Sequence, residues 1–391
     1  MKRLIGIFVA LIMMFNSFSQ DEIDYGDLTG GLNTITTAVP FLLIAPDSRA
    51  GAMGDVGVAT SPDANSIHWN PAKLAFTSED MGASISYVPW LRALVPDINL
   101  SYITGYKKLD NNQVVGLEMR YFSLGNITFT NITGDVIGQY NPHEFALGGS
   151  YARNLSDDFS LAISGRYIYS NLTGGQMAGG IETVAGQSIA SDLAGFYLKP
   201  VRIIGKDMDL AVGLNISNIG SKVSYTETSI RDFIPINMRL GTALDTEIDD
   251  YNTISLALDI NKLLVPTPPI TDNGEIKLGQ SSDVGVVSGI FQSFGDAPGG
   301  FKEEMREINY SIGSEYWYND QFAVRAGYFF EHDTKGGRKF FTFGSGVKYS
   351  SFLLDFSYLV NATTTAGATN PLANTMRFSM TWNFGLNEDI N

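Results

Sequence analysis

The chain has 391 residues, contains no cysteine and carries a formal net charge of −15. The lack of cysteine excludes a disulfide framework and a lipidated cysteine, and the acidic balance argues against nucleic acid as a partner. Glycine (41 residues), phenylalanine (24) and tyrosine (18) are abundant, and after the first twenty residues no apolar run could form a spanning helix. This composition suits a protein that crosses a membrane with strands.

The N-terminus has the pattern of a secretory signal peptide. Lys2 and Arg3 precede the apolar stretch 4–15, and a small-x-small cleavage site ends at Ser19. Acidic residues follow at once, and the apolar stretch is too short for a membrane anchor. We therefore expect residues 1–19 to be removed on secretion.

The next segment, 20–79, does not have the pattern of transmembrane strands. Four prolines in its second part break any long regular element. Gly51, Gly54 and Gly57 recur at a spacing of three, which differs from that of a phosphate-binding loop. We expect these glycines to let the backbone pack closely against a barrel wall. Residues 20–79 are thus predicted to form an N-terminal periplasmic segment and a plug in the periplasmic half of the lumen.

Fourteen later segments alternate between apolar and polar residues with the period of a strand. In 375–384, Met376 and Phe378 fall on one face, and Arg377 and Ser379 fall on the other. A run of about ten such residues is the length of one tilted strand that crosses a bilayer. The predicted strands are 81–89, 97–106, 113–123, 143–154, 159–170, 190–199, 208–217, 236–246, 251–261, 307–318, 321–331, 339–349, 352–361 and 374–384.

The connections between these segments favour a closed barrel. Those after even-numbered strands are short, and those after odd-numbered strands are long, notably 124–142 and 262–306. Outer-membrane barrels have short periplasmic turns and long extracellular loops, so we expect both termini in the periplasm. The predicted fold is an all-β membrane protein: a fourteen-stranded antiparallel outer-membrane β-barrel over 80–384, with an N-terminal plug segment and a periplasmic tail at 385–391.

Charged side chains fall on the predicted inward faces of the strands. They are Glu118, Arg120, Arg166, Arg239, Asp259, Glu315, Arg325, Asp355 and Arg377. The positive and negative charges nearly cancel, which favours a lattice of ion pairs that holds a plug, because a strongly ion-selective pore is more often lined with one dominant sign. The alternative is a set of scattered charges in a water-filled lumen with no special task.

Candidate contacts for a protein partner lie in two predicted extracellular loops. The loop 262–306 is far longer than usual connections and carries Phe291, Phe294 and Phe301. Exposed aromatic side chains of this kind mark interfaces. The alternative is that the loop folds over its own barrel mouth and buries them.

Trp90 and Leu91 in the first extracellular loop are further candidate contacts. An aromatic side chain at this level can instead anchor the barrel at the membrane interface.

The sequence gives little support to catalysis. None of the three histidines, His68, His143 and His332, has the spacing of a metal site or of a catalytic base beside carboxylates. We predict no enzymatic activity, no cofactor and no metal.

Several stretches resemble known outer-membrane proteins. Ser48–Ala59 and Asn70–Ala75 are similar to the N-terminal signature of the FadL superfamily, which are fourteen-stranded barrels whose N-terminal hatch contains an Asn-Pro-Ala turn. The plug-motif residues that this resemblance marks are Arg49, Gly51, Gly54, Asp55, Asn70 and Pro71. A closer resemblance, to the PorV family of barrels of the type IX secretion system, is carried by the stretches 33–42, 45–55, 68–73, 89–99 and 120–125. These stretches cover the plug and the first three strands.

The resemblance implies a binding protein of the secretion machinery. PorV-like proteins dock beside a SprA-type translocon, hold cargo by its C-terminal signal domain and present it to a sortase-like attachment complex on the cell surface. The alternative is a FadL-type transporter of small hydrophobic molecules. A transporter needs a continuous apolar pocket down to the hatch, whereas the shuttle can be permanently plugged. The charged lumen and the aromatic loop favour the shuttle, with outer-membrane lipid as the surrounding medium.

Overall fold

The computed structural model describes residues 31–385, with gaps at 92–94, 96, 131–132, 176, 179–180, 204, 228–230, 363–371 and 373. The predicted signal peptide, the first part of the predicted periplasmic segment and almost all of the predicted tail lie outside the described residues. Within the described part, no helix is both long and apolar enough to cross a membrane.

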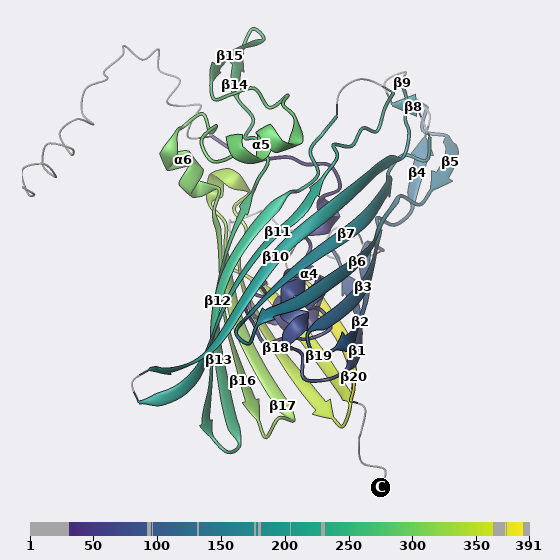
Figure 1. Cartoon of the computed structure of the whole chain (residues 1–391). Coiled ribbons are helices and arrows are strands. Elements are labelled where there is room, and N and C mark those ends of the chain that lie inside the picture. The colour runs from purple at the N-terminus through teal and green to yellow at the C-terminus, as the bar shows by residue number, and fades with distance from the viewer. Residues whose placement is uncertain are drawn as a thin grey trace, which may run out of the picture. The chain divides into compact units, whose positions relative to one another are not determined.

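Fourteen antiparallel strands close into a barrel in which the last strand pairs with the first (Figure 1). Each strand overlaps one predicted segment, so the predicted fold class and strand number are confirmed. The strands are β1 (Met81–Pro89), β2 (Asn99–Asp110), β3 (Gln113–Ser123), β6 (His143–Ser156), β7 (Phe159–Asn171), β10 (Gly186–Ile203), β11 (Lys206–Gly220), β12 (Asn237–Asp249), β13 (Asn252–Leu263), β16 (Asn309–Tyr318), β17 (Phe322–Phe330), β18 (Lys339–Tyr349), β19 (Phe352–Asn361) and β20 (Met376–Phe384).

The barrel wall is apolar outside and polar inside. In β20, Met376 and Phe378 are exposed on the outer face, whereas Arg377 and Ser379 are buried on the inner face. An outer face of exposed apolar side chains is what contact with lipid requires. The alternation read from the sequence therefore assigns the two faces correctly.

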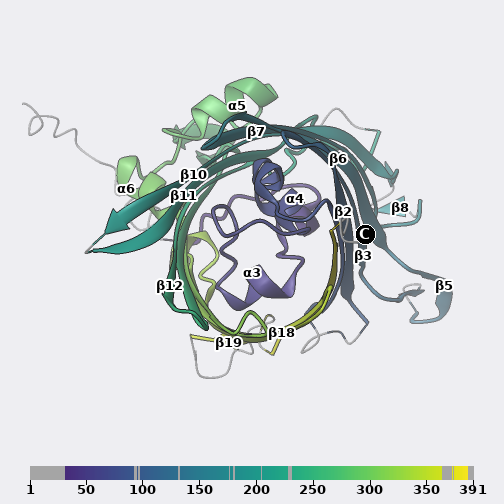
Figure 2. The same cartoon turned by 60° about the horizontal axis from the view of Figure 1, so that its bottom comes forward.

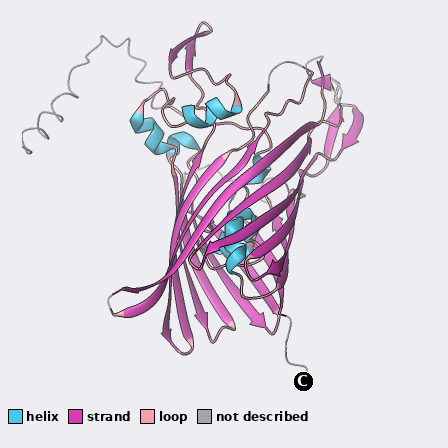
Figure 3. Cartoon of the chain, in the orientation of Figure 1, coloured by secondary structure: helices cyan, strands magenta, loops and turns pink. Residues whose placement is uncertain are grey.

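Short elements lie in the long connections, which all open at one end of the barrel (Figure 3). We call this end the long-loop end and the other the short-turn end. The elements are β4 (Ile127–Thr130), β5 (Val136–Tyr140), β8 (Met177–Ala178), β9 (Ile181–Glu182), β14 (Ile270–Asp272), β15 (Glu275–Leu278), α5 (Val286–Gln292), α6 (Phe301–Arg306) and η3 (Asp333–Lys335). None was predicted, because elements this short leave no clear period in a sequence.

One hairpin is longer than predicted. β10 and β11 pair with each other as far as Ile203 and Lys206, whereas the pairing of β10 with β7 ends at Tyr197. The tip of this hairpin therefore projects beyond the barrel wall at the short-turn end, at the lower left of Figure 1.

Residues 38–77, which precede β1, lie inside the barrel (Figure 2). We call residues 38–77 the luminal segment. It contains η1 (Pro40–Leu43), α3 (Ser48–Ala52), α4 (Ser66–Trp69) and η2 (Pro71–Phe76). Met53, Ile67 and Leu74 of this segment pack against small inward residues of the wall, such as Ala211 and Ala243. The small residues leave the room that the segment occupies.

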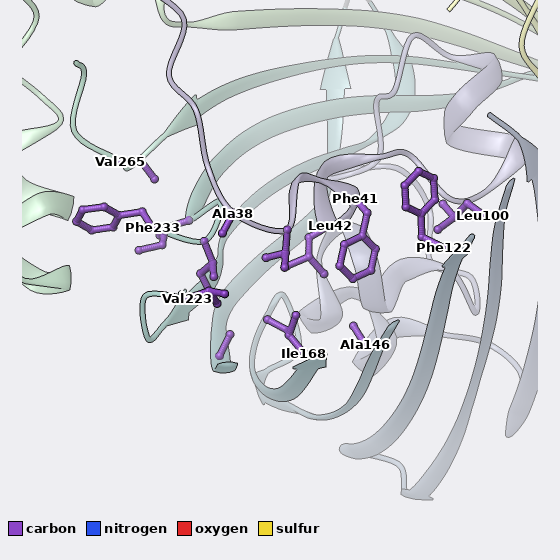
Figure 4. Close-up of a cluster of buried hydrophobic side chains, with 14 of the residues drawn as sticks. Ala38, Phe41, Leu42, Leu100, Phe122, Ala146, Ile168, Val223, Phe233 and Val265 are labelled. Carbon is purple, nitrogen blue, oxygen red and sulfur yellow. The ribbon is translucent and has the colours of Figure 1, made fainter. Parts of the chain in front are cut away.

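A second hydrophobic cluster packs the start of the luminal segment near the long-loop end (Figure 4). Phe41 stacks on Phe122 of β3 with ring centroids 6.2 Å apart. Ala38 and Leu42 lie in the same cluster, together with Ile168 of β7. The apolar run at the start of the segment is thus buried against the wall.

The luminal segment runs the length of the barrel. At its start, the backbone N of Ala38 donates to Phe233 O at 2.8 Å, in the long connection between β11 and β12. Just after its end, Lys108 Nζ, close to the short turn between β2 and β3, donates to Ser78 O at 3.0 Å. The segment therefore reaches both ends and is not restricted to one half of the lumen.

This direction differs from the prediction for 20–79. The first described residues lie at the long-loop end, where Asn33 N donates to Thr334 O at 3.0 Å, and the last strand ends beside Met81 at the short-turn end. The described part of the segment therefore enters the lumen from the long-loop end and fills more than one half of it, unlike the predicted plug. The predicted periplasmic location of the two termini concerns residues outside the described part. The physical reason is the apolar run 39–42, which finds its buried site at the long-loop end.

Candidate functional site

Arg49 joins the luminal segment to the wall through buried ion pairs. It lies on α3, which begins after Asp47, whose carboxylate accepts a hydrogen bond from Ala50 N at 2.9 Å and caps the helix. Its guanidinium binds Glu315 of β16 in a bidentate manner, with Nε–Oε2 at 3.0 Å and Nη2–Oε1 at 2.7 Å. Its Nη1 donates to Asp63 Oδ2 at 2.9 Å. These charge-assisted hydrogen bonds, one pair of them bidentate, give the buried guanidinium and carboxylates the partners that they need away from water.

The ion pairs continue along the wall. Arg325 of β17 donates to Glu315 at 2.5 Å and to Asp355 of β19 at 2.7 Å. Three predicted lumen residues therefore form one row with Arg49, and all of them are buried. The sequence predicted the inward direction of the three but not their partner in the luminal segment.

A second group of ion pairs lies on β3, β7 and β10. Arg166 donates to Glu118 through Nε at 2.8 Å and to Asp192 through Nη2 at 3.0 Å. Tyr102 also donates to Glu118, at 2.7 Å. Asp192 was missed in the sequence, although it shares an inward face with Ala194 and the same alternation would have found it.

Two further predicted lumen arginines bind backbone of the luminal segment. Arg120 donates to Leu42 O at 2.7 Å, and Arg239 donates to His68 O at 3.2 Å. Arg120 also lies 2.7 Å from His68 Nδ1. Cationic donors on carbonyl oxygens fix the path of a segment that has little regular structure of its own.

Asp259 of β13 holds the turn that follows the glycine-rich stretch. Its Oδ2 accepts from the backbone N of Gly57 at 2.8 Å and of Val58 at 3.0 Å. On the other side of this turn, Lys73 Nζ donates to Gly57 O at 2.6 Å. Both charged side chains are buried, so the turn is fixed by one anion and one cation.

The glycines of the plug motif allow close approach to the wall. Arg377 of β20 donates through Nη1 to Gly51 O at 3.2 Å, and its Nη2 lies 3.3 Å from Asp55 Oδ1. A methyl group at Gly51 would lie 2.7 Å from Arg377 Cδ. Gly54 has φ +71°, and a methyl group there would lie 2.7 Å from the backbone N of Tyr328. Larger residues have no room at either position.

Asn70 and Pro71 begin η2. Asn70 Oδ1 accepts from Ala72 N at 3.1 Å and caps the helix, and Pro71 takes the first helical position. Asn70 Nδ2 donates to Val58 O and to Gly195 O of β10, both at 3.1 Å. This turn therefore ties two parts of the luminal segment to each other and to the wall.

The three predicted loop phenylalanines are exposed. Phe291 is 74% exposed on α5, Phe294 is 52% exposed just after it, and Phe301 is 81% exposed at the start of α6. Val287 and Met305, one helical turn from Phe291 and Phe301, are exposed as well. We call these five side chains the aromatic loop surface. The alternative that the loop buries its phenylalanines does not hold in this structure.

A buried charge cluster holds this loop to the barrel. Lys262, at the end of β13, donates to Glu304 at 3.0 Å and to Glu307 at 2.7 Å. Lys335, in η3, donates to Glu303 at 2.5 Å and to Glu307 at 3.0 Å. All five side chains are buried. We call them the loop clamp, because they fix α6 against the long-loop end.

Trp90 and Leu91 are placed differently from the loop phenylalanines. Both are only partly exposed and pack against the hydrophobic cluster that contains Phe41. They also pack against a smaller cluster with Phe329 and Phe340. The structure therefore gives these two residues a packing role at the long-loop end.

The comparisons with known proteins agree with this architecture. A family model described as "Type IX secretion system protein PorV" matches residues 29–270. No curated protein sequence matches the chain.

Solved structures of similar fold include three hydrocarbon or FadL-type proteins. The toluene transporter TodX of Pseudomonas putida has 11% identity and a TM-score of 0.50, over 90% of this chain and 100% of that chain. The toluene transporter TbuX of Ralstonia pickettii has 13% identity and a TM-score of 0.47, over 86% and 98% of the two chains. A Pseudomonas aeruginosa FadL homologue has 11% identity and a TM-score of 0.46, over 90% and 100%. At these identities the likeness concerns the fold alone.

The family and the barrel fold are those of a secretion or transport protein of the outer membrane. Since the family match spans more than half of the sequence, this chain belongs to the PorV family of the type IX secretion system.

Proposed function

We propose that this chain is a non-enzymatic outer-membrane component of type IX secretion that binds cargo by its C-terminal signal domain. In this proposal it receives cargo beside a SprA-type translocon and delivers it to a sortase-like attachment complex on the cell surface. The long-loop end faces the exterior. The observation that carries the proposal is the aromatic loop surface, which is exposed at that end.

Two properties of this surface support a docking role. Large apolar side chains that gather on a surface outside the membrane mark sites of protein contact. The loop clamp also holds α6 in place before any partner arrives, and a surface that is already ordered loses less conformational entropy on binding.

The filled lumen supports a protein that passes no solute. The luminal segment is hydrogen-bonded to the wall near its start, where Leu42 O accepts from Arg120, and the chain is bonded again just after its end, where Ser78 O accepts from Lys108. Between these contacts, Arg49 of the segment binds Glu315 of β16, and Arg377 of β20 donates to Gly51 O of the segment; both arginines are buried. We infer that the segment, with the plug motif, acts as a permanent plug, and that the lumen charges serve to hold it.

The alternative function is a FadL-type transporter of small hydrophobic molecules. One observation favours it: a cavity of about 380 Å³ at the long-loop end, lined in part by Ile35, Leu43 and Leu263. A second cavity of about 80 Å³ adjoins it and is lined by charged groups, including Arg239 and Arg338. The charged groups in so small a cavity, Asp55, Arg239, Glu331 and Arg338, make it a poor path for a hydrophobic solute, so we favour the shuttle.

A chromosomal variant tests the proposal. Replacing Phe291, Phe294 and Phe301 together by serine should remove cargo from the cell surface and the medium, while the barrel still reaches the outer membrane. The matched control is Val136→Ser, an exposed apolar residue on a different long connection, which should secrete normally. A full deletion should abolish secretion and leave uptake of hydrophobic solutes unchanged. Normal secretion with reduced uptake would establish the transporter instead.

A further inference from the structure

At the hairpin tip, residues 198–203 of β10 have no strand partner in β7, and residues 206–208 of β11 have none in β12. Residues 198–203 of β10 pair with residues 206–211 of β11, beyond Tyr197, where the pairing of β10 with β7 ends. In the view from the short-turn end, this tip points outward from the wall (Figure 2). A ribbon in this position extends sideways over the surface of the membrane rather than along the barrel axis.

The two faces of the tip differ in chemistry. On the face that continues the lipid-facing side of the wall, Val201 pairs with Met208 and Ile203 pairs with Lys206. Lys199 lies on the same face, because it is two residues from Val201. This face is therefore apolar with two cationic ends.

The opposite face is polar. Arg202 pairs with Asp207, and Arg202 Nε lies 3.7 Å from Asp207 Oδ1. Pro200 pairs with Asp209 on this face. A ribbon with an apolar, lysine-bearing face and a polar, acidic face is suited to a membrane interface.

Directly above the tip, the outer wall has an apolar groove. Its volume is about 330 Å³, and its lining includes Phe159, Leu161, Leu193 and Tyr197. Gly195 has no side chain to fill the groove. An added methyl group would lie in the groove, 3.4 Å from Leu161 Cδ2, which is an ordinary van der Waals contact. The groove lies on the outer face of β7, β10 and β11, where lipid chains contact the barrel.

The apolar groove and the lysines follow one another along the wall as the acyl chain and the headgroup do in a phospholipid. Phe159 and Tyr197 are a cross-strand pair at the lower end of the groove, and aromatic residues sit at the boundary of hydrocarbon and headgroups. Lys199 is two strand residues beyond Tyr197, which is about 7 Å. The amines therefore begin where the hydrocarbon ends.

We propose that this groove and hairpin form a binding site for an anionic phospholipid of the inner leaflet. One acyl chain lies in the groove, and the headgroup phosphate lies between Lys199 and Lys206. Lys199 Nζ is 3.6 Å from Asp158 Oδ2, which offsets part of its charge. Among the described residues no ion pair engages Lys206, so its full charge acts on the phosphate. The site is independent of cargo binding at the other end of the barrel.

Native mass spectrometry of the purified full chain tests the site, with phosphatidylglycerol and phosphatidylcholine of identical acyl chains as probes. The wild-type protein should retain phosphatidylglycerol in preference. The double variant Lys199→Gln with Lys206→Gln should lose this preference, by about fivefold to thirtyfold in affinity, since each lysine near a headgroup contributes about fivefold. Gly195→Leu should weaken both lipids, because it fills the groove.

Lys348→Gln is the matched control, because Lys348 is exposed at the same end but lies on the inward face of β18. It should bind as the wild type does. Equal retention of the two lipids by the wild type, or an unchanged preference in the double variant, would overturn the proposal. The tip would then be free to contact a periplasmic protein instead.

Discussion

Replacing Arg49 by alanine should open the luminal segment. The Arg49 guanidinium makes two bonds to Glu315 and one to Asp63, and it is 9% exposed. Loss of a partner from a buried ion pair costs about 3–5 kcal/mol. Glu315 keeps its contact with Arg325, so we take the lower end of that range, about 3 kcal/mol.

The absence of cysteine from the chain makes this opening measurable. Ala64 is fully buried in the luminal segment, so a cysteine introduced there reacts with a maleimide only when the segment opens. A change of about 3 kcal/mol raises the open population by about a hundredfold, at 1.4 kcal/mol per factor of ten. The labelling rate of purified Ala64→Cys protein should rise by about the same factor when Arg49→Ala is added.

Two variants give this experiment its controls. Arg153→Ala removes an exposed arginine of β6 and should leave the labelling rate unchanged. Arg49→Lys keeps the charge but loses the bidentate geometry, so its rate should fall between the two. An Arg49→Ala protein that labels as slowly as its parent would refute the view that ion pairs hold the segment in the barrel.

Three further predictions concern the plug motif and the loop. Gly54→Ala should lower the temperature at which the barrel unfolds on heated gels, because φ is +71° and the added methyl group would meet the backbone of Tyr328. The expected loss of stability is about 1–3 kcal/mol. An unchanged unfolding temperature would contradict this prediction. Lys335→Gln leaves two buried glutamates without this cation, so limited proteolysis of the loop 262–306 should become faster, and equal cutting would count against the loop clamp. Burial raises the pKa of Asp296 to about 6, so the folded loop favours the protonated carboxyl. Hydrogen-exchange protection of the loop 262–306 should therefore be highest below about pH 4 and fall as the pH rises through about 6. Asp296→Asn should remove this pH dependence.

The strands could be predicted because their signal is local. In β20 the polarity of each residue indicates whether it faces the lumen or the lipid. Fourteen such segments, joined by alternating short and long connections, predict the closed barrel that the structure has. The glycines of the plug motif were also informative, since the need of Gly51 and Gly54 for close approach follows from their missing side chains.

The partners inside the barrel could not be predicted, because they depend on contacts between residues far apart in the chain. Nothing near Arg49 in sequence identifies Glu315, which is bound across the lumen. The direction of the luminal segment depends in the same way on where the run 39–42 is buried. Asp192 is different, because its inward direction was readable from the alternation of β10.

The exposure of the loop phenylalanines needed the structure as well. Phe291 lies on α5, a helix of only seven residues. A helix this short has too few turns for the period of its apolar residues to show which face is buried. The sequence therefore left both readings open, and the packing of α6 by the loop clamp decides between them.

The most direct test of cargo binding is photo-crosslinking in living cells. A photoreactive phenylalanine analogue at Phe291 should form adducts with the C-terminal signal domain of secreted cargo. The same analogue at Phe322, exposed on the outer wall at the short-turn end, should form none. Cargo adducts from both positions, or from neither while the protein is abundant in the outer membrane, would contradict the proposed docking of cargo on the aromatic loop surface.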